Sequence, residues 1–147
     1  ESVNNVILFC ETIFEKNSIV CKFKHSEDLI INCNQIDFSD SILNIIDNSI
    51  YALVNNKDKE DRYILINFSN KILSIKDSGN GIEEEIITKI FEPYFTTKHQ
   101  SFGVGLGLFT VHEFFVRNLN FKIEFKNEEF EYKNKKLKGL NININFN

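Results

Sequence analysis

Proline, glycine, cysteine, methionine and tryptophan are scarce in this chain. Its 147 residues hold one Pro, six Gly, three Cys and no Met or Trp. So little Pro and Gly excludes collagen-like and low-complexity sequences. Cys10, Cys21 and Cys33 include no Cys-x-x-Cys pair, and their odd number cannot close into a complete disulfide set. We therefore interpret them as buried, small apolar side chains in a reducing compartment.

Long apolar runs and an excess of positive charge are also missing. Lys and Arg number 17 against 21 Asp and Glu, a formal net charge of −4. This balance indicates neither a nucleic-acid partner nor direct membrane contact. The basic run KNKKLK at 133–138 is interpreted as a solvated hairpin connection. No apolar run approaches the roughly 20 residues of a membrane helix, and no signal-peptide pattern opens the chain.

Hydrophobic periodicity predicts one two-layer α/β domain, with helices in one layer and a mixed, largely antiparallel sheet in the other. The predicted helices cover 2–14, 37–55, a short segment from near Glu83, and 105–117. The predicted strands are 18–24, 28–33, 63–69, 71–77, 120–125, 129–133 and 139–146. Because the chain opens on Glu1 directly into a helical pattern, we interpret it as a fragment of a longer protein.

The predicted helix over 37–55 carries two stripes at helical spacing. Its apolar stripe predicts the buried face and consists of Ile42, Leu43, Ile46, Ile50, Leu53 and Val54. The opposite stripe is polar and consists of Asn44, Asn48, Tyr51 and Asn55. Asparagine is a mediocre helix former, because its amide competes for backbone hydrogen bonds. The polar stripe is therefore either a functional surface or an ordinary solvent face in an Asn-rich protein.

The few glycines gather in two short stretches. In DSGNG, residues 77–81, a strand ends in Asp77 and two glycines follow. Such a carboxylate can lie at the floor of a cleft, where the amino group of a base is a natural donor. The alternative is an ordinary turn between a strand and a helix. In GVGLGL, residues 103–108, glycines lead into a predicted helix, so exposed backbone N–H groups could bind phosphate.

Together and in this order, these features resemble the N, G1, F and G2 boxes of the ATP-binding domain of sensor histidine kinases, which has the Bergerat fold of the GHKL superfamily. The F-box stretch is FEPYFTTK, residues 91–98, and it is the most family-specific of the four. The resemblance covers 18–147. It implies a mixed sheet covered on one face by about three helices and a mobile ATP lid from about Thr96 to Phe102. Residues 1–17 would be a helical segment, the tail of an upstream dimerisation hairpin.

The resemblance also implies a role for each matching residue. Asp77 would accept a hydrogen bond from the adenine amino group, and Asn48 would offer its side-chain oxygen to Mg²⁺. The implied catalytic residues are Asn44, Asn48 and Lys98. The implied nucleotide-binding residues are Asn44, Asn48, Tyr51, Asp77, Gly79, Gly81, Ile82, Thr97, Lys98, Gly103, Val104, Gly105, Leu106, Gly107 and Leu108.

Three positions in the first motif bear on the chemistry. Tyr51 stands where many family members carry Lys or Arg, and a phenol cannot neutralise a phosphate. Ser49 replaces the Ala that follows the metal-binding Asn in the family's motif. Asn44 stands where hydrolytic and serine-kinase relatives place a Glu as general base. Slow hydrolysis is therefore expected, whereas transfer to a neutral imidazole requires mostly positioning and charge stabilisation.

The resemblance implies a protein-histidine kinase that binds ATP and Mg²⁺ and phosphorylates a histidine outside this chain. His112 lies in HEFFVR within the helix behind the phosphate loop, so we reject it as the acceptor. The implied partners are the histidine-bearing dimerisation domain of the same protein, in a homodimer, and the receiver domain of a response regulator. The domain would face the cytoplasm, whether or not its parent is anchored in the inner membrane. The alternatives are an anti-sigma-type serine kinase, a degenerate nucleotide-binding or scaffolding module, and an α/β domain with accidental glycine turns.

Overall fold

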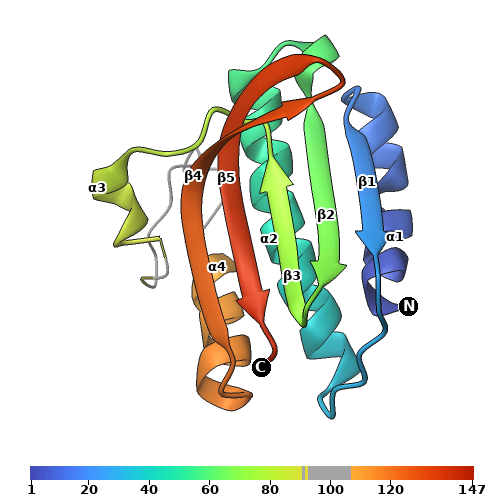
Figure 1. Cartoon of the computed structure of the whole chain (residues 1–147), viewed down its shortest axis with the longest axis vertical. Coiled ribbons are helices and arrows are strands. Elements are labelled where there is room, and N and C mark those ends of the chain that lie inside the picture. Colours follow the sequence, from blue (N-terminus) through green and yellow to red (C-terminus); the bar gives the residue numbers. More distant parts are fainter. Residues whose placement is uncertain (91, 93–106) are drawn as a thin grey trace.

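The sheet has five strands and carries its helices on one face (Figure 1). The computed structural model describes residues 1–90, 92 and 107–147. The strands are β1 (Val20–His25), β2 (Tyr63–Ser69), β3 (Ile72–Asp77), β4 (Lys122–Tyr132) and β5 (Lys135–Asn145). Their order across the sheet is β1-β2-β3-β5-β4. Only β1 and β2 pair in parallel, so the predicted mixed, mostly antiparallel sheet is confirmed.

The helical layer lies behind the sheet in Figure 1. It contains α1 (Ser2–Lys16), α2 (Gln35–Asn56) and α4 (Gly107–His112), which continues into the π-helical η2 (Glu113–Asn118). The short α3 (Glu84–Ile87) lies beyond the β4 edge, and η1 (Lys59–Asp61) precedes β2. None of the helices in the described ranges combines the length and the apolarity needed to cross a membrane.

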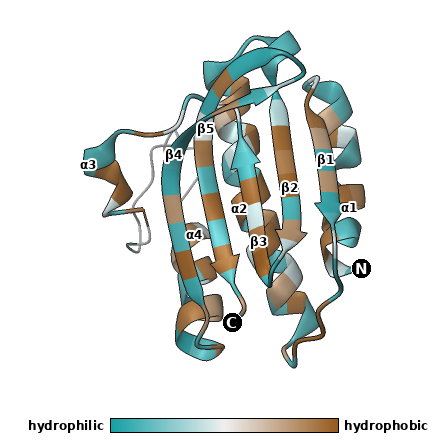
Figure 2. Ribbon diagram, viewed as in Figure 1, coloured by the Kyte–Doolittle hydropathy of each residue, from teal (hydrophilic) through white to brown (hydrophobic). Residues whose placement is uncertain are grey.

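The core lies between the sheet and the helices. Apolar and polar residues alternate along the strands (Figure 2), which buries one face of each strand. The side chains with least exposure include Ile64, Ile66, Ile75, Ile144, Ile42, Ile45, Ile46, Val111 and Phe115. The three cysteines are free. Cys10 is fully buried, as predicted, whereas Cys21 and Cys33 are only partly buried. Burial raises the pKa of the half-buried Cys21 thiol to about 12.

Two tight hairpins connect four of the strands. The central residues of both turns, Asn70 with Lys71 and Lys133 with Asn134, have positive φ angles, as type I′ turns require. The first turn confirms the predicted connection at Asn70. The second shows that the interpretation of 133–138 as a connection is only partly correct, because β5 begins at Lys135. The predicted strands 120–125 and 129–133 form the single strand β4, because the polar residues between them also pair with β5.

The predicted strand over 28–33 is wrong, because these residues form an irregular connection from β1 to α2. A strand requires a neighbouring backbone to satisfy its N–H and C=O groups. In the described part of the chain β1 pairs with β2, and the segment after it turns away from the sheet toward the helical layer. Ile31 and Cys33 pack against the core, whereas Ile30 is 97% exposed.

Helix α2 begins where an asparagine caps it. The side chain of Asn34 accepts hydrogen bonds from the backbone N–H groups of Ile36 and Asp37, at 2.8 and 3.2 Å. The predicted buried stripe is wrong at Val54, which is 40% exposed. It also omitted Ile45, which is fully buried. The buried face includes two serines, so a search for apolar residues alone placed the stripe too far round the helix.

Candidate functional site

The candidate site centres on Asp77, the last residue of β3. Its side chain is buried, with 4% of its surface exposed. Oδ1 accepts hydrogen bonds from the backbone N–H of Gly79 at 2.9 Å and of Leu140 at 3.4 Å. Oδ2 accepts a hydrogen bond from the hydroxyl of Ser49 at 3.0 Å. Helix α2, strand β5 and the loop after β3 therefore all contribute to holding one carboxyl group.

The environment of Asp77 acts on its charge in two opposing ways. Burial raises the pKa of the carboxyl group, because it removes water from the ionised form. The hydrogen bonds from Gly79, Ser49 and Leu140 lower that pKa, although the effect of burial is larger. A carboxylate oxygen can accept two hydrogen bonds. Within the described residues Oδ2 accepts one hydrogen bond, from Ser49, which leaves this oxygen capacity for a second donor.

Three glycines around Asp77 are required by contacts within the protein. A Cβ on Gly79 would lie 2.7 Å from the Cβ of Ala52. Gly81 has a φ angle of +72°, and a Cβ there would collide with the side-chain oxygen of Asn127. A Cβ on Gly139 would overlap the backbone carbonyl of Asp77. Gly79 and Gly81 were predicted as site residues, whereas Gly139 was missed because β5 meets β3 only in the folded sheet.

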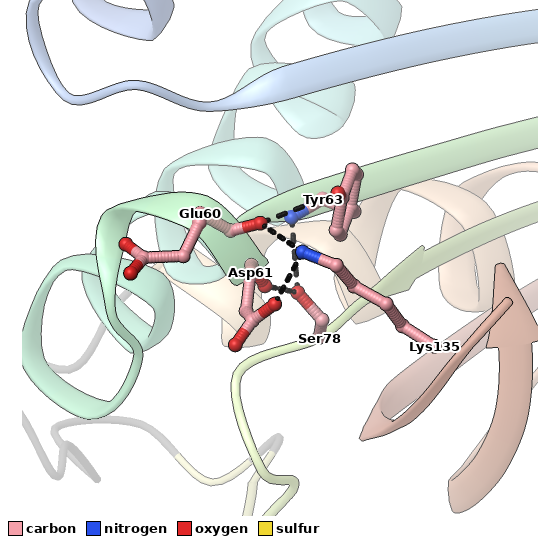
Figure 3. Close-up of polar contacts among 5 residues, drawn as sticks. All are labelled: Glu60, Asp61, Tyr63, Ser78 and Lys135. Atoms are coloured by element: carbon pink, nitrogen blue, oxygen red, sulfur yellow. Dashed lines mark hydrogen bonds and ion pairs between the residues drawn. The ribbon is translucent and has the colours of Figure 1, made fainter. Parts of the chain in front are cut away.

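Ser78, the residue after Asp77, anchors the loop to η1 and to the start of β2 (Figure 3). Its fully buried hydroxyl accepts a hydrogen bond from the backbone N–H of Tyr63 at 2.9 Å and donates one to the carbonyl of Asp61 at 2.6 Å. Lys135 donates to the carbonyl of Glu60 and to the carboxylate of Asp61, at 2.9 and 2.8 Å. The hydrogen bond from Lys135 lowers the pKa of Asp61. This network joins the start of β5 to the end of β3.

The rest of the loop is also held by side chains. The amide of Asn80 donates to the carbonyl of Asn56 at the end of α2, at 2.9 Å, and its backbone N–H donates to the carbonyl of Lys138 at 2.9 Å. Asn127 on β4 accepts from the backbone N–H of Ile82 at 2.9 Å and donates to the carbonyl of Ile82 at 2.5 Å. Asn127 was missed, although a polar residue in the inward-facing phase of β4 was a usable signal.

The polar stripe of α2 is divided between two environments. The amide of Asn44 donates to the hydroxyl of Thr110 at 3.1 Å, and that hydroxyl donates to the carbonyl of Gly107 at 2.7 Å. Asn44 therefore lies against the first turn of α4. Asn48 and Tyr51 are half-buried on the same helix. Asn55 is exposed and donates to the carbonyl of Tyr51, so at this position the stripe is an ordinary solvent face.

Several predicted site residues lie outside the described residues. They are Thr97, Lys98, Gly103, Val104, Gly105 and Leu106, together with the predicted lid over 96–102. Gly107 and Leu108 are described, and Leu108 is buried in the core, so only its backbone can contact a ligand. In the described ranges no group of three or more His, Cys, Asp or Glu side chains is arranged to hold a metal ion.

Comparison with known proteins identifies relatives along most of the chain. Residues 33–145 match the family model described as histidine kinase-, DNA gyrase B-, and HSP90-like ATPase. Sporulation kinase C of Bacillus subtilis (strain 168) is 26% identical over 114 residues, which cover 71% of this chain and 26% of that protein. This chain therefore spans only about a quarter of the length of that relative.

Solved structures share the fold. A nucleotide-free catalytic domain of the histidine kinase ThkA is 26% identical, with a TM-score of 0.73, over 98% of this chain and 91% of that one. ThkA in complex with the response regulator protein TrrA is 23% identical, with a TM-score of 0.70, over 98% of this chain and 39% of that one. The fold is therefore that of histidine kinase catalytic domains. The match across 33–145 shows that the chain belongs to the family of histidine kinase-, DNA gyrase B- and HSP90-like ATPases.

Proposed function

We propose that this chain is the ATP-binding catalytic domain of a sensor histidine kinase. It binds Mg-ATP and transfers the γ-phosphoryl group to a histidine on a separate dimerisation domain. The observation that carries the proposal is the buried carboxyl group of Asp77, which accepts from Ser49 and Gly79 and can accept one further donor. The amino group of adenine supplies such a donor. Membership of an ATPase family supports a nucleotide as the ligand.

The metal site is proposed from donor chemistry. Mg²⁺ prefers oxygen ligands and is commonly held by one or two protein oxygens together with phosphates of the substrate. The side-chain oxygen of Asn48 suits this role, and Asn48 lies one turn from Asn44, which contacts Thr110 at the start of α4. When bound, the ion neutralises charge on the transferred phosphoryl group. Asn48 would hold it, and Asn44 would keep α2 against α4 beside it.

Transfer to histidine is favoured over hydrolysis by the residue at position 44. The amide of Asn44 donates to Thr110 and has no basic group that could remove a proton from water or from a serine hydroxyl. A neutral imidazole attacks without losing a proton first. The anti-sigma-type serine kinase is therefore the weaker alternative.

The partners proposed for the domain follow from its relatives. The histidine would lie in a dimerisation domain of the same protein, within a homodimer, and the phosphoryl group would pass to the receiver domain of a response regulator. The structure of ThkA with TrrA supports a partner of the second kind. We also propose that the domain faces the cytoplasm, where ATP is available. Because the chain spans about a quarter of sporulation kinase C, autophosphorylation belongs to the longer protein.

Calorimetric titration with a non-hydrolysable ATP analogue, with and without Mg²⁺, tests the proposal. We expect magnesium-dependent binding to the 147-residue chain and its loss in Asp77→Asn, which presents an amide donor where adenine also donates. Asp58→Asn is the matched control, because Asp58 is an exposed carboxylate outside the site. If the unsubstituted chain does not bind the analogue, a scaffolding module becomes the better interpretation.

A further inference from the structure

Ser49 contacts Asp77, but the proposed function gives this serine no role of its own. It follows Asn48 on α2, it is buried, and its hydroxyl donates to Oδ2 of Asp77 at 3.0 Å. Serine and aspartate are 28 residues apart in the chain, so the contact depends on the packing of α2 against β3. In the motif that this helix resembles, alanine stands at the position of Ser49. Compared with that motif, this chain therefore has an extra hydroxyl beside the carboxyl group that would recognise the base.

The hydrogen bonds to Asp77 divide into fixed and variable donors. Oδ1 accepts from the backbone N–H groups of Gly79 and Leu140, which every side-chain substitution except proline leaves in place. Oδ2 accepts from Ser49, which is the side-chain donor of the three. Oδ2 is also the oxygen with capacity for a ligand. The hydroxyl of Ser49 therefore donates to the same oxygen that would meet the base, and alanine in its place would remove this hydrogen bond.

We propose that Ser49 is a positioning residue that keeps Asp77 an ionised acceptor and thereby makes the site select purines with an amino group at C6 over purines with a carbonyl there. The proposal rests on the proposed function, because it assumes that Asp77 meets a purine. An ionised carboxylate only accepts hydrogen bonds, so it attracts an amino group and repels a carbonyl oxygen. A protonated carboxyl group also donates, so it can bind the carbonyl instead.

The surroundings of Asp77 make its protonation state depend on the hydrogen bond from Ser49. Burial raises the pKa of this carboxyl group, and the hydrogen bonds from Gly79, Ser49 and Leu140 oppose that effect. The described residues that face it from the packed elements are uncharged, and they are Ser49 and Ala52 on α2, Ile64 on β2, and Gly139 and Leu140 on β5. Losing the Ser49 hydroxyl removes one of the hydrogen bonds that lower the pKa of Asp77 and therefore moves that pKa further upward.

Binding of two nucleotides by the 147-residue chain tests the proposal. ADP carries an amino group at C6, and inosine diphosphate carries a carbonyl there. We expect the unsubstituted chain to prefer ADP, and Ser49→Ala to reduce that preference roughly tenfold at pH 7, because hydrogen bonds to charged groups are the stronger class. ADP affinity should fall as the pH is lowered and Asp77 is protonated, and the midpoint of that fall should shift to higher pH in Ser49→Ala. Ser49→Thr, which keeps the hydroxyl, should restore both properties.

Two further measurements separate positioning from packing. Ser41→Ala removes a buried serine from the same helix, about 12 Å along its axis, and should leave both properties unchanged. Titration of the Asp77 carboxyl carbon by NMR needs no nucleotide and should give a higher midpoint in Ser49→Ala. Equal losses of ADP and inosine diphosphate affinity, or an unchanged carboxyl midpoint, would overturn the proposal. Absence of ADP binding to the unsubstituted chain would overturn the proposed function and the selectivity together. The carboxyl titration needs no nucleotide, so it tests the effect of Ser49 on Asp77 independently of the proposed function.

Discussion

The two irregular segments that leave β3 and β1 are opposite in character. The loop at 77–82 is polar and glycine-rich. Side chains of Ser49 on α2 and Asn127 on β4 hold it by hydrogen bonds, and its own Ser78 and Asn80 donate to backbone carbonyls of Asp61 and Asn56. The segment at 26–34 is partly apolar, yet Ile30 is almost fully exposed. A polar, glycine-rich sequence therefore does not imply that the loop at 77–82 is poorly held. A loop that a site depends on is fixed by donors and acceptors from distant elements, and its substitution should be costly.

Gly139→Ala should lower the stability of the protein more than the other substitutions considered below. A Cβ at this position would overlap the backbone carbonyl of Asp77 and force β5 away from the loop. We expect the free energy of unfolding to fall by about 3 kcal/mol, the upper end for overpacking. Urea denaturation measures the change. Asn143→Ala, at a position in the same phase of β5, is the control and should cost much less. Equal losses in the two variants would contradict the role assigned to the close approach.

Asp77→Asn should separate stability from binding. The pKa of Asp77 is raised in the folded state, so its contribution to stability is complete below the unfolded value of about 3.9 and is lost as pH rises through the folded pKa. A neutral amide avoids that loss. We expect Asp77→Asn to have a higher melting temperature than the unsubstituted chain at pH 7, and the difference to vanish below about pH 3.9. Thermal denaturation across this range is the measurement, and a lower melting temperature at pH 7 would refute the expectation.

Asn127→Ala tests the side-chain link between β4 and the end of the loop. It removes the hydrogen bonds to both backbone groups of Ile82, so we expect a loss of about 1–2 kcal/mol in the free energy of unfolding. Amide hydrogen exchange at Ile82 should become faster, while exchange in the interior strand β2 changes only with global stability. Unchanged exchange at Ile82 would show that the backbone holds this end of the loop without Asn127.

Ile30→Ser should have the smallest effect. The side chain is 97% exposed in the segment after β1, so its removal from water is not part of folding. We expect a change within about 0.5 kcal/mol in the free energy of unfolding. Chemical denaturation measures it against Gly139→Ala and Asn127→Ala. A loss comparable to that of Asn127→Ala would mean that the two segments do not differ as described.

Local patterns predicted much of the fold. The tight turn at Asn70, the long helix α2 and the strand that ends at Asp77 depend on residues close together in the chain, and the structure confirms them. The segment at 28–33 was predicted wrongly because its apolar residues satisfied a strand pattern without a neighbouring strand to pair with.

The site was predictable only in part, for a related reason. Asp77 and the glycines after it form a recognisable motif, whereas the groups that hold them come from far along the chain. Leu140 is 63 residues from Asp77, and Asn127 is 45 residues from Ile82. Ser49 was noticed as a departure from the family's motif, but its hydrogen bond could not be predicted without the packing of α2 against β3. A local pattern can mark such a residue, as it does for Asn127, but the partner of that residue is set by how distant strands pair in the folded sheet.

The position of β5 between β3 and β4 also has a consequence for the order of folding. When β3 has left the ribosome, the residues that donate and pack at Asp77 from β5 have not yet been synthesised. Contacts of such long sequence separation form late, because loop closure must precede them. The carboxyl group of Asp77 thus stays hydrated until the last strand docks. Burial of this one side chain would therefore be a direct measure of whether the nascent chain has finished folding.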